Sequence, residues 1–232
     1  MSNPSKKDIG SLFDRIAGTY DRFNHLLSLN VDKSWRRRSV RALRTAGSVL
    51  DVAIGTGDLA IEMVRQGKAG NVTGMDLSTG MMKIGGEKVA RKGLQDRISF
   101  EQGSALDMPY EDGMFDAVTC AYGLRNFSDP DKGLSEMFRV MRSGGQLMIL
   151  EFSYPENRFV RGVYDFFFTN IMPLVGRVIS KDPAAYIYFR ESVKGFFWGD
   201  EMLSHIREAG FANAEFKTMT FGISTLYLAE KP

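Results

Sequence analysis

One stretch near residue 50, VLDVAIGTGDL, combines residue types that suit a small-molecule site. Apolar residues surround Asp51, as in a buried parallel strand, and the chain then passes through Gly55 and Gly57, which lack a Cβ and permit a sharp turn. Asp58 is expected to cap the following helix with its side-chain oxygen. A strand, a glycine turn and a helix N-terminus in this order indicate a site for a nucleotide-like ligand.

Asp51 helps to distinguish the two ligand classes that use such a turn, dinucleotides and S-adenosylmethionine. The glycine spacing alone does not decide, because a dinucleotide fingerprint tolerates alanine where Ala60 stands. A carboxylate near the end of the strand would repel a pyrophosphate but attract an ammonium group, and S-adenosylmethionine carries both an ammonium and a sulfonium. The pattern therefore favours S-adenosylmethionine. A structural role for Asp51, in which it accepts hydrogen bonds from the turn, remains the alternative.

Two later strand ends supply positions at which a nucleoside would be held. Asp76 ends the second expected strand, where a carboxylate of a doubly wound sheet can accept the ribose hydroxyls. The alternative role of Asp76 is to cap the helix that Ser78 begins. Ser104 and Ala105 follow the third expected strand, where the adenine is expected to lie.

The order of the expected elements predicts an α/β fold. Strands that alternate with helices over short connections are typical of a mostly parallel, doubly wound sheet with helices on both faces. Apolar periodicity and glycine or proline boundaries place the elements. The expected strands cover residues 49–53, 71–76, 98–102, 115–121 and 146–152; the helices cover residues 59–66, 79–92 and 130–141, the last capped by Asp129 and followed by Gly144 and Gly145; a helix over residues 200–209, capped by Asp200, and strands over residues 213–217 and 225–230 close the fold.

Two segments outside the alternating pattern are rich in aromatic residues. An amphipathic helix is expected from Asp8, and the arginines after it, at positions 36, 37, 38, 41 and 44, indicate either a solvated helix face or a footing on anionic lipids. Residues 153–198 form an aromatic insertion that could be core, the wall of a pocket for an apolar substrate, or a membrane surface. Its uncharged centre, residues 166–175, is too short to span a bilayer.

Composition bounds the class of protein. The chain has 232 residues, of which 44% are hydrophobic, so one large domain with a sizeable core is expected. Its net charge of +2 argues against a nucleic-acid-binding role. The single cysteine, Cys120, is expected in the core, and the N-terminal residues show no secretion signal, so a cytoplasmic protein is expected.

Four parts are expected within the single domain. Residues 1–45 are expected to form a helical cap on the substrate side, and residues 46–152 the core that binds S-adenosylmethionine. Residues 153–198 form the helical aromatic insertion, on the substrate or membrane side, and residues 199–232 a closing helix and β-hairpin. No metal site is expected.

Two longer stretches allow a family to be recognised. They are FDRIAGTYDRFNHLLSLNVDKSW near the start and FDAVTCAYGLRNFSDPDKGLSEMFRVMRSGGQLMILEFS in the second half. In these stretches the chain resembles the C-methyltransferases of ubiquinone and menaquinone biosynthesis, and the likeness extends from about Phe13 to the final strand. The resemblance implies a Rossmann-like class I methyltransferase fold, with a seven-stranded, mostly parallel sheet whose last strand is antiparallel, and S-adenosylmethionine as the cofactor.

The resemblance also implies which residues contact the cofactor, and this chain departs from the family pattern at three places. Ser104 stands where asparagine or aspartate is frequent, so the adenine is expected to be held more through the backbone. Ala121 stands where a serine is frequent, which removes a hydroxyl near the cofactor, and Asp32 replaces a histidine and is given no catalytic role. The expected cofactor-binding residues are Asp51, Gly55, Thr56, Gly57, Asp76, Leu77, Ser104, Ala105 and Ala121.

The implied chemistry is methyl transfer to an aromatic carbon, which needs an electron-rich ring. A reduced quinone becomes electron-rich when a hydroxyl ionises, but a phenol has a pKa of about 10, so the phenolate costs roughly 4 kcal/mol near neutral pH. Arg125 is the expected cation facing this anion, and a salt bridge that anchors a loop is the alternative. The phenolic proton has four candidate acceptors: water, Tyr122, Asp21 and Glu151. The expected catalytic set is Arg125, Asn126, Tyr122 and Asp21.

The expected substrate is a reduced prenylated quinone, and the favoured reaction converts demethylmenaquinol to menaquinol. The benzoquinol of the ubiquinone pathway remains open, as does O- or N-methylation of another small molecule, although the aromatic residues over 159–179 weigh against a polar substrate. A cofactor-binding protein without transferase activity is a further alternative. The apolar substrate leaves open a peripheral attachment to the inner face of the cell membrane, and a homodimer is also left open.

Overall fold

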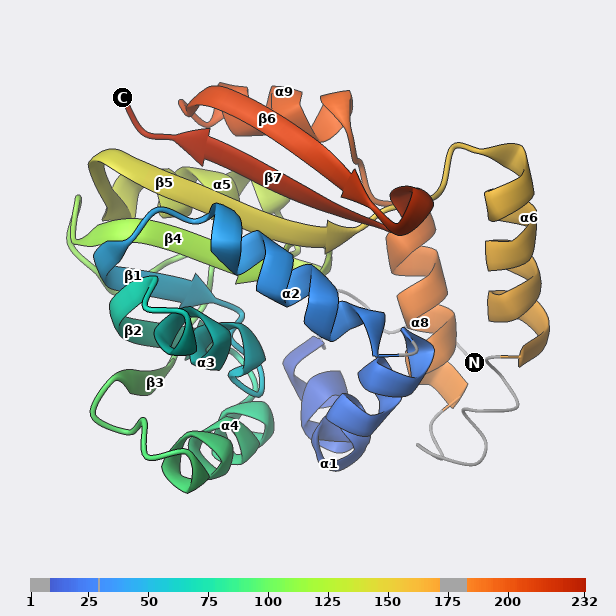
Figure 1. Cartoon of the computed structure of the whole chain (residues 1–232), viewed down its shortest axis with the longest axis horizontal. Helices are drawn as coiled ribbons and strands as arrows, with labels where there is room; N and C mark the ends of the chain where they lie inside the picture. Colours follow the sequence, from blue (N-terminus) through green and yellow to red (C-terminus); the bar gives the residue numbers. More distant parts are fainter. Residues whose placement is uncertain (1–8, 29, 172–182) are drawn as a thin grey trace.

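A single mixed sheet of seven strands organises the protein (Figure 1). The structure, a computed structural model, describes residues 9–28, 30–171 and 183–232. The strands lie in the order β3-β2-β1-β4-β5-β7-β6, in which the first five pair in parallel and β7 is antiparallel to both of its neighbours. Their bounds are β1 (Ala46–Val52), β2 (Ala69–Asp76), β3 (Ile98–Gln102), β4 (Phe115–Ala121), β5 (Met141–Phe152), β6 (Ala212–Met219) and β7 (Ser224–Glu230).

Helices cover both faces of the sheet, as the alternating sequence pattern predicts. Side chains alternate along each strand, so Val49 faces one hydrophobic cluster and Leu50 faces the other. The first cluster includes residues of α2 (Val31–Ala42), α3 (Asp58–Arg65) and α4 (Thr79–Arg91), and the second includes residues of α5 (Pro130–Val140) and α9 (Asp200–Glu208). The α/β class and the antiparallel last strand are therefore confirmed, and Cys120 is buried.

The remaining helices lie beyond the carboxyl ends of the parallel strands (Figure 1). The N-terminal helix α1 (Ile9–Leu27) packs against α4. The insertion after β5 contains α6 (Arg158–Phe166), the π-helical turn η3 (Phe167–Ile171) and α8 (Pro183–Lys194), and Tyr188 of α8 packs against Leu12 and Ile16 of α1. Among the described helices, none is both long and apolar enough to cross a membrane.

Two predicted helix caps are wrong. Gly57 and Gly199 occupy the N-cap positions of α3 and α9, and neither Asp58 nor Asp200 caps with its side chain, because each is the first residue of its helix. Both glycines have positive φ, 78° for Gly57 and 63° for Gly199, which a residue without a Cβ adopts at little cost. The cap by Asp129 is confirmed, since its side chain accepts a hydrogen bond from the Lys132 amide at 2.9 Å.

The boundary between α5 and β5 also differs from the prediction. The helix ends at Val140, and β5 begins at once with Met141, so Gly144 and Gly145 lie within the strand and not in a loop before it. The register against β4 shifts between the pairs Phe115↔Met141 and Ala117↔Gln146. A positive φ of 75° at Gly144 accommodates this irregularity, which apolar periodicity cannot reveal.

Candidate active site

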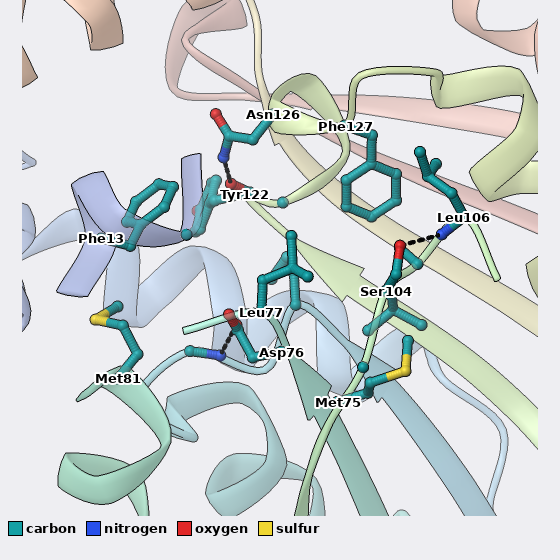
Figure 2. Close-up of a pocket in the computed structure, with 18 of the residues that line it drawn as sticks. Phe13, Met75, Asp76, Leu77, Met81, Ser104, Leu106, Tyr122, Asn126 and Phe127 are labelled. Atoms are coloured by element: carbon teal, nitrogen blue, oxygen red, sulfur yellow. Dashed lines mark hydrogen bonds between the residues drawn. The ribbon is translucent and has the colours of Figure 1, made fainter. Parts of the chain in front are cut away.

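A cleft lies at the carboxyl ends of β1, β2 and β4, where the strand order reverses (Figure 2). Its main cavity has a volume of about 220 Å³, and a smaller cavity of about 50 Å³ adjoins it. The two cavities share Tyr20, Ala53, Gly55 and Tyr122 among their lining residues. Of the thirteen site residues expected from the sequence, all but Gly57 and Arg125 line one cavity or the other.

The turn after β1 is held in place by the strand beside it. The Gly55 amide donates to Asp76 Oδ2 at 2.8 Å, and the Ser78 amide donates to Asp76 Oδ1 at 2.9 Å. Ser78, not Asp76, caps α4, since the Ser78 hydroxyl accepts from the Met81 amide. Burial raises the pKa of Asp76, and the backbone donors oppose this rise. Each oxygen of Asp76 can still accept a further hydrogen bond, as ribose hydroxyls would require.

Asp51 is a buried carboxylate with an unused oxygen. Thr119 donates to its Oδ1 at 2.7 Å, whereas Oδ2 has no hydrogen-bond partner in the described part of the chain. Burial raises the pKa of Asp51 to about 7, although the Thr119 hydrogen bond lowers it. The hydrogen bond comes from β4 and not from the glycine turn, so the structure does not favour the alternative role as an anchor of that turn. An unpartnered buried oxygen is costly, and a ligand ammonium would satisfy it.

A network of charged side chains joins α1 to the smaller cavity. Asp21 accepts from the Thr56 hydroxyl at 2.7 Å and forms an ion pair with Lys88 at 2.6 Å. Lys88 also pairs with Asp58 at 2.7 Å, and Asp14 fixes the other end of α1 by accepting from the Ser78 hydroxyl at 2.6 Å. Asp21 therefore lies at the Thr56 side of the cleft and is already paired. Sequence analysis did not identify Lys88, which lies outside the recognised stretches, and it assigned no role to Asp14, although Asp14 lies within the first of them.

The structure buries Arg125 in an ion pair. Its Nη1 lies 2.8 Å from Glu151 Oε1 and also donates to the Tyr122 carbonyl oxygen, and its guanidinium lies 5.3 Å from the ring centroids of Phe152 and Phe189. The Arg125 amide donates to the second oxygen of Glu151 at 3.2 Å. This arrangement is the loop-anchoring salt bridge that was the alternative to a direct catalytic contact.

The backbone at the ends of β1 and β4 is strained. Ala53 and Tyr122 have φ values of 57° and 60°, which non-glycine residues rarely adopt. A Cβ added to Gly123 would lie 2.6 Å from the Ala53 Cβ, so the two strand ends approach closely only because residue 123 is glycine. Such strain is concentrated at functional sites, where the surrounding structure enforces it.

Tyr122 and Asn126 follow the end of β4 and line the main cavity, and Tyr122 also lines the smaller one. The Tyr122 ring stacks on Phe152 with centroids 4.4 Å apart, and its hydroxyl is buried beside the Ser224 side chain. Burial raises the pKa of Tyr122, so the hydroxyl stays protonated. Asn126 donates from Nδ2 to the Tyr122 carbonyl at 3.3 Å, and Figure 2 shows this bond beside the cavity.

Apolar side chains form much of the main cavity, and sequence analysis missed part of this lining. Leu77, which is half exposed, Ala105 and Phe127 are among these residues, and the Ser104 hydroxyl accepts from the Leu106 amide at 3.2 Å (Figure 2). The missed lining residues are Phe127 and Met81, together with Gly10, Phe13 and Tyr20 from α1. The apolar stripe of the predicted N-terminal helix was the available signal for α1.

The arginines of α2 do not form a uniform basic surface. Arg36 is buried and pairs with Asp32 at 2.6 Å and with Asp58 at 3.1 Å. Arg44, which follows α2, pairs with Glu230 at 2.8 Å. Arg36 is therefore part of the interior and is not available to the predicted contact of this arginine cluster with anionic lipids.

Comparison with known proteins gives a consistent result. The sequence profile of the ubiE/COQ5 methyltransferase family matches residues 1–231. The demethylmenaquinone methyltransferase of Bacteroides fragilis is 42% identical over 99% of this chain and 96% of its own length, and the ubiquinone/menaquinone biosynthesis C-methyltransferase UbiE of Geobacter sulfurreducens is 41% identical over 96% and 88%. The structure is similar to a possible histamine N-methyltransferase from Thermotoga maritima, with a TM-score of 0.68, 17% identity and coverage of 96% and 99%. At that identity, the last similarity shows the fold alone.

Proposed function

The chain belongs to the ubiE/COQ5 methyltransferase family, and we propose that it uses S-adenosylmethionine to methylate a ring carbon of demethylmenaquinol, a reduced prenylated quinone. The observation that carries the proposal is a cleft lined by two chemically different sets of residues. Carboxylates and the glycine turn form one set, and aromatic side chains of α1 and of the loop after β4 form the other. Relatives of this chain carry the name demethylmenaquinone methyltransferase, which favours the naphthoquinol over the benzoquinol.

The carboxylates and their neighbours in the cleft fit S-adenosylmethionine. The unpartnered Oδ2 of Asp51 suits the ammonium group, and Asp76 suits the two ribose hydroxyls. Ala105 and Leu77 offer apolar surface to the adenine. When bound, this cofactor supplies an electrophilic methyl group, and the protein's own residues orient the acceptor ring.

The aromatic side chains of the cleft suit a quinol ring. Phe13, Tyr20 and Tyr122 line the main cavity, and Asn126 adds an amide that can donate to a quinol oxygen. We propose that Asn126 contacts the substrate and that the Tyr122 ring packs beside it. The high pKa of Tyr122 makes its hydroxyl a hydrogen-bond donor at neutral pH and a poor proton acceptor.

The proposed role of Arg125 is to position its neighbours. The Glu151 carboxylate balances its charge at 2.8 Å, so little net positive field remains for a phenolate. Both Glu151 oxygens already accept hydrogen bonds, and Asp21 is paired with Lys88. Water is therefore the proposed acceptor of the phenolic proton.

A labelled methyl-transfer assay tests the function. Short-tailed demethylmenaquinol, its oxidised quinone and the corresponding benzoquinol are offered separately with methyl-labelled S-adenosylmethionine. We expect label in the naphthoquinol and little in the oxidised quinone, because only the reduced ring can supply phenolate density. Preferred labelling of the benzoquinol would assign the chain to the other quinone. Tight cofactor binding without transfer to any of the three would contradict a quinone substrate.

We also propose that the protein attaches to the membrane surface through α6 and not through the arginines of α2. Phe159, Val163 and Phe166 lie on one face of α6, spaced by four and three residues, and are 81%, 56% and 60% exposed. Phe221, at the tip between β6 and β7, is 80% exposed, and this tip adjoins the start of the insertion, since Ser153 donates to the Gly222 carbonyl. Four of the six large apolar side chains exposed in the described chain thus gather at one end of the molecule, where a lipid-borne substrate would arrive.

Co-sedimentation with lipid vesicles tests this surface. The variant Phe159→Ser/Phe166→Ser is compared with Met114→Ser, which changes an apolar, 51% exposed side chain at the amino end of the central strand β4, whereas α6 follows the carboxyl end of β5. We expect the double variant to lose binding to phosphatidylcholine vesicles, with and without phosphatidylglycerol, while Met114→Ser binds like wild type. If an Arg37→Ala/Arg38→Ala variant loses binding and the phenylalanine variant keeps it, the footing lies on α2.

A further inference from the structure

A tyrosine from the aromatic insertion makes a hydrogen bond to a side chain in the cleft. The Tyr188 hydroxyl of α8 donates to Asn126 Oδ1 at 2.9 Å, and both residues are only 8% exposed. The two residues are 62 positions apart in the sequence, and no motif links them. The ring of Tyr188 packs against Leu12 and Ile16 of α1. This residue of the insertion therefore contacts both the N-terminal helix and the active-site loop.

The hydrogen-bond partners of Asn126 allow one orientation of its amide. The Tyr122 carbonyl can only accept a hydrogen bond, so the amide nitrogen of Asn126 must face it. The amide oxygen then faces Tyr188, whose hydroxyl is free to donate. One hydrogen of Nδ2 is used by the Tyr122 carbonyl, and the second is left over on a residue that lines the main cavity.

The state of Tyr188 is compatible with this donor role. Burial raises its pKa to about 12, although the nearby Arg125 charge opposes the rise. The phenol is therefore neutral and carries its proton at physiological pH. Because Asn126 Oδ1 is buried, loss of the hydroxyl would leave that oxygen without its donor.

We propose that Tyr188 is a positioning residue, which fixes the Asn126 amide so that its remaining N–H points to an oxygen of the quinol. This inference rests on the proposed function, since it names the group that would hold the acceptor ring. It also gives the insertion a role in the reaction itself. Tyr188 acts through Asn126 and needs no contact with the substrate.

The variant Tyr188→Phe removes the hydroxyl and keeps the ring that packs on α1. We expect kcat to fall about 5- to 150-fold, the range that corresponds to an unsatisfied buried acceptor, while the Kd for S-adenosylhomocysteine stays within about twofold. Tyr164→Phe is the matched control, because Tyr164 of α6 is also buried but its hydroxyl has no hydrogen-bond partner in the described chain. This control should keep wild-type kcat.

The decisive measurement is a double-mutant cycle. In an Asn126→Ala background, Tyr188→Phe should change kcat less than twofold, because a residue that acts only through Asn126 has nothing left to position. If the two substitutions multiply their effects, or if Tyr164→Phe loses as much activity as Tyr188→Phe, the inference is wrong. Wild-type activity on demethylmenaquinol is recorded first, so failure of the proposed function would be seen before any variant is compared.

Discussion

Arg125 and Glu151 form a buried ion pair, with Nη1 2.8 Å from Oε1 and side-chain exposures of 4% and 2%. The pair joins the short 3-10 helix η2 (Leu124–Asn126) to the end of β5, and Arg125 also bonds the carbonyl of the strained Tyr122. Arg125 thus holds the loop that borders the cleft and does not itself line the cleft.

Arg125→Ala should destabilise the fold by about 3–5 kcal/mol, because Glu151 would be left as an uncompensated buried charge. Urea unfolding followed by circular dichroism measures this change. The double variant Arg125→Met/Glu151→Leu removes both charges and should recover most of the stability, without recovering methyl transfer. Normal stability of Arg125→Ala, combined with a large loss of kcat, would instead favour a direct role of the guanidinium at the substrate.

Asp51 should make both cofactor binding and stability depend on pH. Its folded-state pKa of about 7 lies above the usual value, so the folded protein holds more protons than the unfolded chain between pH 4 and 7. Without ligand, stability attributable to Asp51 should therefore fall by about 4 kcal/mol as the pH rises through this window. The comparison of wild type with Asp51→Asn isolates the effect, because the free energy of unfolding of the asparagine variant should lack this fall between pH 4 and 7.

The affinity for S-adenosylhomocysteine, which keeps the ammonium group, should rise between pH 6 and 8 as Asp51 ionises. Asp51→Asn should bind about 10- to 100-fold more weakly, the range for a charged hydrogen bond, and with little pH dependence in this range. Isothermal titration calorimetry at several pH values checks both points. A wild-type affinity that is flat with pH would mean that the ammonium lies elsewhere.

Asp21→Asn tests whether Asp21 of α1 supports cofactor binding or accepts the phenolic proton. Because Asp21 pairs with Lys88 and accepts from Thr56, its loss should weaken S-adenosylmethionine binding several-fold and leave kcat at saturating cofactor within about threefold of wild type. Steady-state kinetics at two salt concentrations give kcat and the KM for S-adenosylmethionine as separate parameters. A fall of a hundredfold or more in kcat, with unchanged cofactor affinity, would restore Asp21 as a proton acceptor.

Gly123→Ala should destabilise the protein by about 1–3 kcal/mol, because the added methyl would lie 2.6 Å from the Ala53 Cβ and 2.9 Å from the Cys120 sulfur. Gly86→Ala is the matched control. It lies within α4, where an added methyl meets nothing within 4 Å, and should stabilise the helix by about 0.5–1 kcal/mol. Equal thermal stability of the two variants would contradict the close approach of the strand ends.

Much of the fold was predictable because its signals are local. Alternating apolar strands and helices over short connections predict the doubly wound sheet, and the observed β3 and β4 have the expected bounds. The helix after Asp129 begins as predicted, because the cap and the following proline act within a few residues of each other. The predicted caps by Asp58 and Asp200 are wrong because glycine and aspartate are both good N-cap residues, and here the preceding glycine takes that position.

The sequence by itself determined the sheet, the glycine turn and the set of strand ends that meet in the cleft, since parallel strands bring their carboxyl ends to one edge. Only the tertiary structure decided which of these groups pair with other side chains through ion pairs and hydrogen bonds. Glu151 takes the charge of Arg125, Lys88 takes that of Asp21, and Tyr188 reaches Asn126 from the insertion. Hydrogen bonds and ion pairs depend on distances of a few ångströms between segments that are far apart in the chain. No local pattern of residues encodes such distances.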